Sequence, residues 1–213
     1  MEEAGGTQLF LVVEAGQSAL DRLSAALGAA PIASVLIMPP TGGTLAAAAV
    51  DPLIRRVQSQ GAAALLFADA DLARSLGADG VHLPYGKDLE DRYKRARQTM
   101  GRSAIVGIHA GKSRHDAMVL AEAGADYVAF GIPDGIQDRT SAHERRLDLV
   151  AWWAEIFEVP CVALDVEGPA DAAQLVQAGA DFIGFTVGPG EQLADVARRV
   201  EDIADALAPA PAD

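Results

Sequence analysis

Acidic, histidine and hydroxyl side chains follow many of the short apolar stretches that are predicted to be buried strands. If the ends of these strands lie together, their carboxylates and one imidazole could hold a divalent metal ion through oxygen and nitrogen ligands. No compact ligand spacing accompanies them, so a solvated acidic rim is the plainer interpretation. The side chains are Glu14, Asp69, Tyr85, His109, Asp134, Asp165, Glu167 and Thr186.

A second set of residues could act on a proton or on an anion. His109 ends an apolar stretch, where an imidazole can serve as acid or base near neutral pH; a loop histidine without a chemical role is the alternative. Lys112 and Arg114 begin a predicted helix, whose N–H groups also favour an anion. Gly188 and Gly190 precede the last predicted helix and offer further backbone N–H groups. Ordinary surface charge is the alternative for the basic side chains.

One phrase that recurs three times organises the elements that must position these residues. It reads GADGVHL from Gly77, GADYVAF from Gly124 and GADFIGF from Gly179. Each copy follows an alanine-rich helical pattern and opens an apolar run. Glycine ends a helix because it adopts positive φ without steric cost. We expect the aspartate to lie at the strand entrance, away from the mouth, and the apolar run to be buried on both faces.

The order of the elements predicts a single (β/α)₈ barrel over residues 1–207, followed by a disordered tail at 208–213. A doubly wound open sheet is the rival, but no Gly-x-Gly-x-x-Gly follows the first strand. The predicted strands are 8–13, 32–38, 62–67, 79–83, 103–108, 126–130, 160–164 and 181–186. The predicted helices are 18–27, 45–60, 69–76, 88–100, 112–123, 143–157, 169–178 and 191–207.

Composition narrows the range of partners. The 213 residues carry a formal net charge of −13 and only 5% aromatic residues, which disfavours nucleic acid and anionic membranes. No apolar run is long enough for a membrane helix, so we expect a soluble cytoplasmic protein. Trp152 and Trp153 point about 100° apart on a helix, so one should lie near the surface, where it could form a homodimer contact.

Four stretches together resemble the thiamine-phosphate synthase family and its thiazole tautomerase relatives. They are LFLVVEAG from Leu9, residues 65–83 ending in LGADGVHL, residues 105–131 ending in GADYVAFG, and residues 159–185 ending in GADFIGF. The resemblance implies a barrel enzyme that joins an aminopyrimidine pyrophosphate to a thiazole phosphate with Mg²⁺ and releases pyrophosphate. It also implies that Asp69 and Asp88 are the magnesium ligands, with Asp88 displaced by one residue from the family position.

The departures from the family pattern lie in the loops that bind substrate. Residues 38–41 contain no cation where the family has a Gln-Leu-Arg-x-Lys run. His109 stands at the family's serine. In place of a Thr-x-Thr-Lys loop the chain offers only Arg139 and Thr140, and Ile132 stands where the tautomerase branch has a histidine.

The loop after the seventh strand departs most. The family holds phosphate there on a Gly-Gly loop, whereas this chain has Asp165 and Glu167. If both carboxylates face the phosphate, each like-charge pair costs on the order of 4 kcal/mol at about 4 Å and an effective dielectric of about 20. Binding would weaken roughly a thousandfold.

Three functions therefore stay open. The first is an altered family member that binds a small, optionally phosphorylated ligand. The second is an active synthase with Mg²⁺ on Asp69 and Asp88, His109 as the catalytic residue, and substrate on Lys112, Arg139, Thr140, Gly188 and Gly190. The third is a non-enzymatic regulator or partner protein, for which the barrel is a scaffold.

Overall fold

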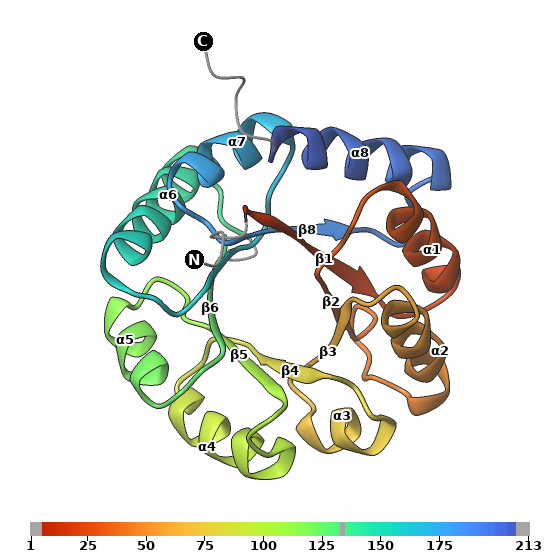
Figure 1. Cartoon of the computed structure of the whole chain (residues 1–213), viewed down its shortest axis with the longest axis horizontal. Coiled ribbons are helices and arrows are strands. Elements are labelled where there is room, and N and C mark those ends of the chain that lie inside the picture. Colours follow the sequence, from red (N-terminus) through yellow and green to blue (C-terminus); the bar gives the residue numbers. More distant parts are fainter. Residues whose placement is uncertain (1–5, 133–134, 208–213) are drawn as a thin grey trace.

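Eight parallel strands close into a barrel, and eight helices surround it in chain order (Figure 1). The computed structural model describes residues 6–132 and 135–207, so the predicted tail at 208–213 lies outside the described residues. The strands are β1 (Gln8–Glu14), β2 (Ser34–Met38), β3 (Ala63–Phe67), β4 (Gly80–Leu83), β5 (Ile105–His109), β6 (Tyr127–Phe130), β7 (Cys161–Ala163) and β8 (Phe182–Val187). The helices are α1 (Ala19–Ala29), α2 (Ala47–Gln58), α3 (Ala70–Leu76), α4 (Leu89–Met100), α5 (Arg114–Glu122), α6 (Arg139–Ile156), α7 (Pro169–Gln177) and α8 (Leu193–Ala206).

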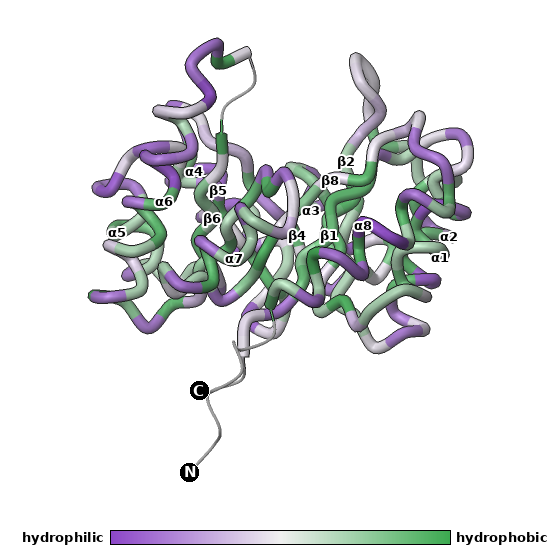
Figure 2. The backbone as a smooth tube through the Cα atoms, turned by 90° about the horizontal axis from the view of Figure 1, so that it is seen from above, coloured by the Kyte–Doolittle hydropathy of each residue, from purple (hydrophilic) through white to green (hydrophobic). Residues whose placement is uncertain are grey.

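The strands are apolar almost throughout because both of their faces are buried. Alternate residues point inward, where Phe10, Val12 and Leu36 belong to a cluster that fills the barrel. The residues between them, such as Leu11 and Val13, pack under the helices in the larger cluster. β1 pairs with β8 as well as with β2, which closes the sheet. Hydrophobic residues concentrate in the strands, and hydrophilic residues in the outer turns and loops (Figure 2).

The recurring Gly-Ala-Asp phrase joins strands in pairs at the barrel end opposite the mouth. The three glycines, at 77, 124 and 179, have φ values of 69°, 95° and 92°. Each aspartate carboxylate accepts the backbone N–H of a residue at the start of the preceding strand, at 2.7–2.8 Å. Its own backbone N–H donates to the carbonyl of that same residue. The pairs are Asp79 with Ala64, Asp126 with Val106, and Asp181 with Cys161.

The start of α6 is the one boundary of the described helices that differs from the sequence prediction by more than two residues. α6 begins at Arg139, four residues before the predicted start, because the Asp138 carboxylate caps it by accepting the N–H of Ser141 at 3.1 Å. Arg139 and Thr140 therefore lie in the first turn of a helix and not in a loop. α2 runs from Ala47 through Pro52 without a break. Within the described residues, none of the helices is long and apolar enough to cross a membrane.

Candidate functional site

A cavity of about 570 Å³ opens at the mouth, where the strands end at their carboxyl termini. This size suits a small organic ligand. The strand residues Val12, Leu36 and Phe67 give it an apolar floor, and the loop after β2 forms one wall. The described polar side chains of its lining are Glu14, Thr41, His82, His109, Asp165 and Thr186, and none of the described lining residues is a lysine or an arginine.

Two histidines lie on neighbouring strands beneath and beside this cavity. The Nδ1 atom of His82, on β4, is 2.7 Å from the hydroxyl oxygen of Tyr127 inside the barrel. Burial and the nearby His109 lower the pKa of His82 to about 3. Burial also lowers the pKa of His109, at the end of β5, to about 4. Both imidazoles are therefore neutral at pH 7, and His109 can accept or donate a hydrogen bond toward the cavity.

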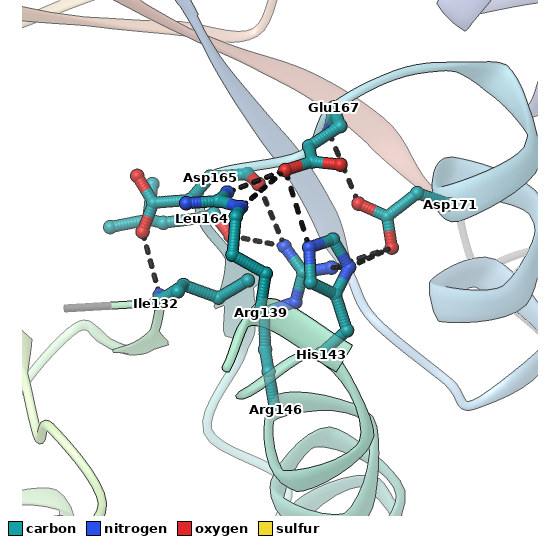
Figure 3. A network of polar contacts seen from close by, with 8 residues as sticks. All are labelled: Ile132, Arg139, His143, Arg146, Leu164, Asp165, Glu167 and Asp171. Atoms are coloured by element: carbon teal, nitrogen blue, oxygen red, sulfur yellow. Dashed lines mark hydrogen bonds and ion pairs between the residues drawn. The ribbon is translucent and has the colours of Figure 1, made fainter. Parts of the chain in front are cut away.

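Asp165 approaches His109 across Gly131, the first residue after β6. A Cβ atom placed on Gly131 would lie 2.5 Å from Asp165 Oδ2 and 2.9 Å from His109 Nε2, so only glycine leaves both atoms in place. Asp165 has a φ of 61°, a left-handed conformation that costs most non-glycine residues about 1–2 kcal/mol. Its carboxylate accepts the backbone N–H of Ile132 at 2.8 Å (Figure 3).

A buried arginine fixes the loop that carries Asp165. Arg146, on α6, is 2% exposed and donates to the carbonyls of Leu164 and Asp165 at 2.7 and 3.0 Å. It also pairs with Asp171 at 2.5 Å. The network continues on the side of the loop away from the cavity, where Arg139 donates to Glu167 (Figure 3). Glu167 thus lines a separate groove between α6 and α7 and does not face the mouth cavity, contrary to the expectation for both loop carboxylates.

Four backbone N–H groups in the loops at the mouth donate to carboxylates of the chain. Glu14 accepts the N–H of Thr41 at 2.9 Å and its hydroxyl at 3.2 Å. Glu191 accepts the N–H of Gly188 at 2.6 Å. The Asp165 carboxylate accepts the N–H of Ile132, and the Asp171 carboxylate accepts the N–H of Glu167 at 3.1 Å. The N–H groups bonded in this way lie in the loops after β2, β6, β7 and β8.

The two predicted metal ligands follow β3 and β4 and are both exposed. Asp69 caps α3, because its Oδ1 accepts the N–H of Leu72 at 2.9 Å, whereas Asp88 makes no side-chain cap bond at the start of α4. Within the described ranges, no three His, Cys, Asp or Glu side chains gather closely enough to hold a metal ion. Two carboxylates nevertheless suit Mg²⁺ when phosphate oxygens of a ligand and water complete its shell.

The structure separates the residues predicted to bind substrate. Arg139 and Thr140 line the groove between α6 and α7, where Arg139 is paired with Glu167. Lys112 is exposed and lines a small hollow beside Gly131. The N–H of Gly188 is bonded to Glu191, while Gly190 is exposed. Only His109, of the predicted catalytic and substrate residues, lines the mouth cavity; Asp134 lies outside the described residues.

Sequence reasoning missed three residues that shape the mouth, Arg146, Asp171 and Glu191, and it missed the bonding role of Glu14. Glu191 follows Gly188 by three residues but precedes Gln192, the N-cap residue of α8, so the bond is not a capping box and no such pattern in the sequence marks it. Arg146 and Asp171 lie on different helices, and nothing local in the sequence indicates that they meet.

A family model and individual relatives both match this chain, and they belong to the same family. A family model described as thiamine monophosphate synthase matches residues 9–187. A thiamine-phosphate synthase of Erythrobacter litoralis is 43% identical over 139 residues, which cover 63% of this chain and 64% of that protein. One of Rhodospirillum centenum is 42% identical over 157 residues, covering 72% of this chain and 73% of that protein. The match with the Erythrobacter protein thus spans less than two thirds of its length.

Solved structures agree on the fold. A thiamine phosphate pyrophosphorylase from Pyrococcus furiosus superimposes with a TM-score of 0.74 at 17% identity, covering 94% of this chain and 95% of that one. A tryptophan synthase chain from Mycobacterium tuberculosis superimposes with a TM-score of 0.73 at 15% identity, covering 95% and 93%. At such identities the likeness concerns the barrel alone.

Proposed function

The chain belongs to the thiamine monophosphate synthase family, and from this premise we propose that it is an altered member. It binds a small ligand at its mouth and does not catalyse the reaction that releases pyrophosphate. The observation that carries the proposal is the bonding of the mouth loops. Their N–H groups at Thr41, Ile132, Glu167 and Gly188 already donate to carboxylates of the chain. Phosphate sites on barrel loops depend on such N–H groups.

Electrostatics supports the same conclusion. A phosphate in the cavity would meet the carboxylates of Glu14 and Asp165, and no described lysine or arginine lines the cavity to offset them. To reach the N–H of Gly188 or Ile132, the phosphate would have to displace a carboxylate that is already bonded. The displaced carboxylate would stay next to the phosphate and repel it, so the exchange is unfavourable.

The test is a direct assay of the family reaction. The protein is incubated with an aminopyrimidine pyrophosphate, a thiazole phosphate and Mg²⁺, and pyrophosphate release is measured against a blank without protein. We expect release at the level of the blank from a protein whose circular dichroism and cooperative thermal unfolding show that it is folded. Release above the blank that scales with protein concentration would contradict the proposal.

An active synthase is the second candidate, and the exposed carboxylates of Asp69 and Asp88 favour it. Bound Mg²⁺ would there neutralise the charge that develops on the departing pyrophosphate. Asp69 and Asp88 would hold the ion jointly with phosphate oxygens, and His109 could accept or donate a proton within the cavity. In this case Asp69→Asn, which preserves a capping oxygen, should abolish release. Asp202→Asn, an equal change of charge on the exposed face of α8, should not alter it.

A further inference from the structure

We propose that Tyr127, beneath the mouth cavity, is a positioning residue that holds His82 in the tautomer with its proton on Nε2. His82 then presents a fixed hydrogen-bond donor at the floor of the cavity. The use of that donor by a ligand rests on the proposed function, whereas the tautomer itself can be measured on the protein alone. The inference begins with the 2.7 Å contact between Nδ1 of His82 and the hydroxyl oxygen of Tyr127.

One row of residues across neighbouring strands brings these two side chains together. His82 on β4 is in register with Gly107 on β5, and Gly107 is in register with Tyr127 on β6. The three strands lie side by side in the barrel wall (Figure 1). A Cβ atom on Gly107 would lie 1.9 Å from Cζ of Tyr127, so the tyrosine ring occupies the place that a side chain at 107 would take. Tyr127 therefore reaches across β5 to His82 because residue 107 is glycine.

Both partners of this contact are buried and uncharged. His82 is 2% exposed and Tyr127 is 6% exposed. Burial and the nearby His109 lower the pKa of His82, and burial raises the pKa of Tyr127 well above its usual range. At pH 7 the phenol therefore keeps its proton, and the imidazole carries one. The contact has two possible forms: either the hydroxyl donates to Nδ1, or Nδ1–H donates to the hydroxyl oxygen.

The remaining hydrogen of each form separates the two. Among the described residues, the hydroxyl of Tyr127 has no hydrogen-bond partner other than His82. If Nδ1–H donated, the O–H of Tyr127 would be left without an acceptor inside the barrel. If the hydroxyl donates, every polar hydrogen below the cavity is bonded and the imidazole proton lies on Nε2. An unpaired buried O–H disfavours the form with Nδ1–H by about 10-fold or more.

The Nε2 atom of His82 is open to the mouth cavity. In the part of the chain that the structure describes, the fully buried side-chain nitrogen and oxygen atoms without a partner are Nε of Arg22 and Nε of Arg146. Nε2 of His82 forms no hydrogen bond with a described residue and is not one of these atoms, so it is accessible from the cavity that His82 lines. Phe67, whose ring stacks against His82 with the planes 23° apart, surrounds it with apolar surface.

This arrangement sets His82 apart from the other neutral polar side chains of the cavity. The Thr186 hydroxyl and the His109 ring form no hydrogen bond with a described residue, so each can donate or accept. The Thr41 hydroxyl donates to Glu14. His82, with its Nδ1 already bonded, can only donate, through Nε2–H. A ligand that covers this point must place an acceptor there or leave the Nε2–H without a partner.

Nitrogen-15 NMR of the full chain, labelled at histidine, tests the assignment at pH 7 without any ligand. Two-bond correlations between the ring nitrogens and the carbon-bound ring protons distinguish a protonated from an unprotonated nitrogen, and His82→Gln identifies the signals of His82. Tyr127→Phe removes the hydroxyl and keeps the ring. Tyr93→Phe is the matched control, because the side chain of Tyr93 is also buried and its hydroxyl donates to the carbonyl of Ala123 at 3.1 Å.

We expect the wild-type ring to carry its proton on Nε2, with the Nδ1–H form at about one tenth or less. Tyr127→Phe should move the Nδ1 resonance of His82 downfield, as for a nitrogen that loses a hydrogen-bond donor, whereas Tyr93→Phe should leave it in place. The Nε2 proton should exchange with water faster than the hydroxyl proton of Tyr127, because only the first faces the cavity.

Three results would overturn the proposal. They are a wild-type Nδ1–H form above about one tenth, an unmoved Nδ1 resonance in a Tyr127→Phe variant with unchanged circular dichroism, and slower exchange at Nε2 than at the Tyr127 hydroxyl. The first and third are measured on the wild-type chain, so they hold even if Tyr127→Phe fails to fold. None of them depends on pyrophosphate release, so the proposed lack of synthase turnover keeps its own assay.

Discussion

Acidification from pH 7.5 to 4.5 should remove a large share of the stability of this barrel through two histidines. Burial and His109 lower the pKa of His82 to about 3, and burial lowers that of His109 to about 4, from an ordinary value of 6.5. In this pH range the unfolded chain takes up a proton at each histidine while the folded chain takes up almost none. Stability is therefore present above pH 6.5 and is lost as the pH falls.

The size of the effect follows from the width of the window. Between pH 6.5 and 4.5 each histidine contributes about 2 to 3 kcal/mol, because the free energy changes by about 1.4 kcal/mol per pH unit over 2 units. The two together remove about 5 kcal/mol, a large part of the 5–15 kcal/mol that is typical of a domain. The window ends at pH 4.5 because most of the titration of ordinary carboxylates, with pKa values of about 3.9 to 4.3, lies below it.

The assay is urea unfolding at half-unit pH steps, with the free energy of unfolding extrapolated to water at each step. His82→Gln and His109→Gln should each halve the slope of stability against pH, and the double variant should nearly abolish it. His115→Gln, which changes an exposed residue of α5, is the matched control. Two results would refute the reasoning: a wild-type loss of less than about 1 kcal/mol, or an unchanged slope in the double variant.

Three further predictions concern the packing of Gly107, the bond by which Asp126 joins β6 to β5, and the N–H of Gly188, which donates to Glu191. A Cβ atom on Gly107 would lie 1.9 Å from Cζ of the buried Tyr127, so Gly107→Ala should lower the free energy of unfolding by about 3 kcal/mol or more, as measured by thermal unfolding. Gly28→Ala, which has open space around it on α1, should raise that free energy by about 0.5–1 kcal/mol. Equal effects of the two changes would contradict the packing argument. Asp126→Ala should cost about 1–3 kcal/mol and Asp126→Asn less, and faster amide exchange at the start of β5 in the alanine variant alone would confirm the cause. Glu191→Ala frees the N–H of Gly188 and should raise the affinity for inorganic phosphate, measured by calorimetry; an unchanged affinity would show that this N–H is not what keeps phosphate out.

The barrel could be predicted from the sequence because its signals are local. Each glycine at 77, 124 and 179 ends a helical segment, and each following run is apolar because both strand faces are buried. The start of α6 was misplaced because the capping bond of Asp138 lies in a stretch rich in turn-forming residues, where helix and loop are hard to tell apart.

The mouth was harder to predict because its bonds join distant segments. His109 lines the cavity because it ends β5, a position that the apolar run before it predicts, whereas its catalytic role stays a prediction. Glu167 was expected to face the same cavity, but the direction of its side chain depends on Arg139 in another element. The pairing of Glu14 with Thr41 likewise arises only when β1 and β2 lie side by side. Whether Asp69 and Asp88 hold a metal ion stays a prediction.

The three aspartates of the Gly-Ala-Asp phrases join six of the eight strands into two-strand modules. Asp79 ties β4 to β3, Asp126 ties β6 to β5, and Asp181 ties β8 to β7, each by a reciprocal pair of bonds to one residue. Each joint lies within a segment of contiguous chain and at the end of the barrel away from the mouth. New termini introduced between modules, in α4 or α6, would thus leave both partners of every aspartate bond within one continuous segment. Termini placed inside a module would separate its two halves, so circular permutation should tolerate the first kind of cut better than the second.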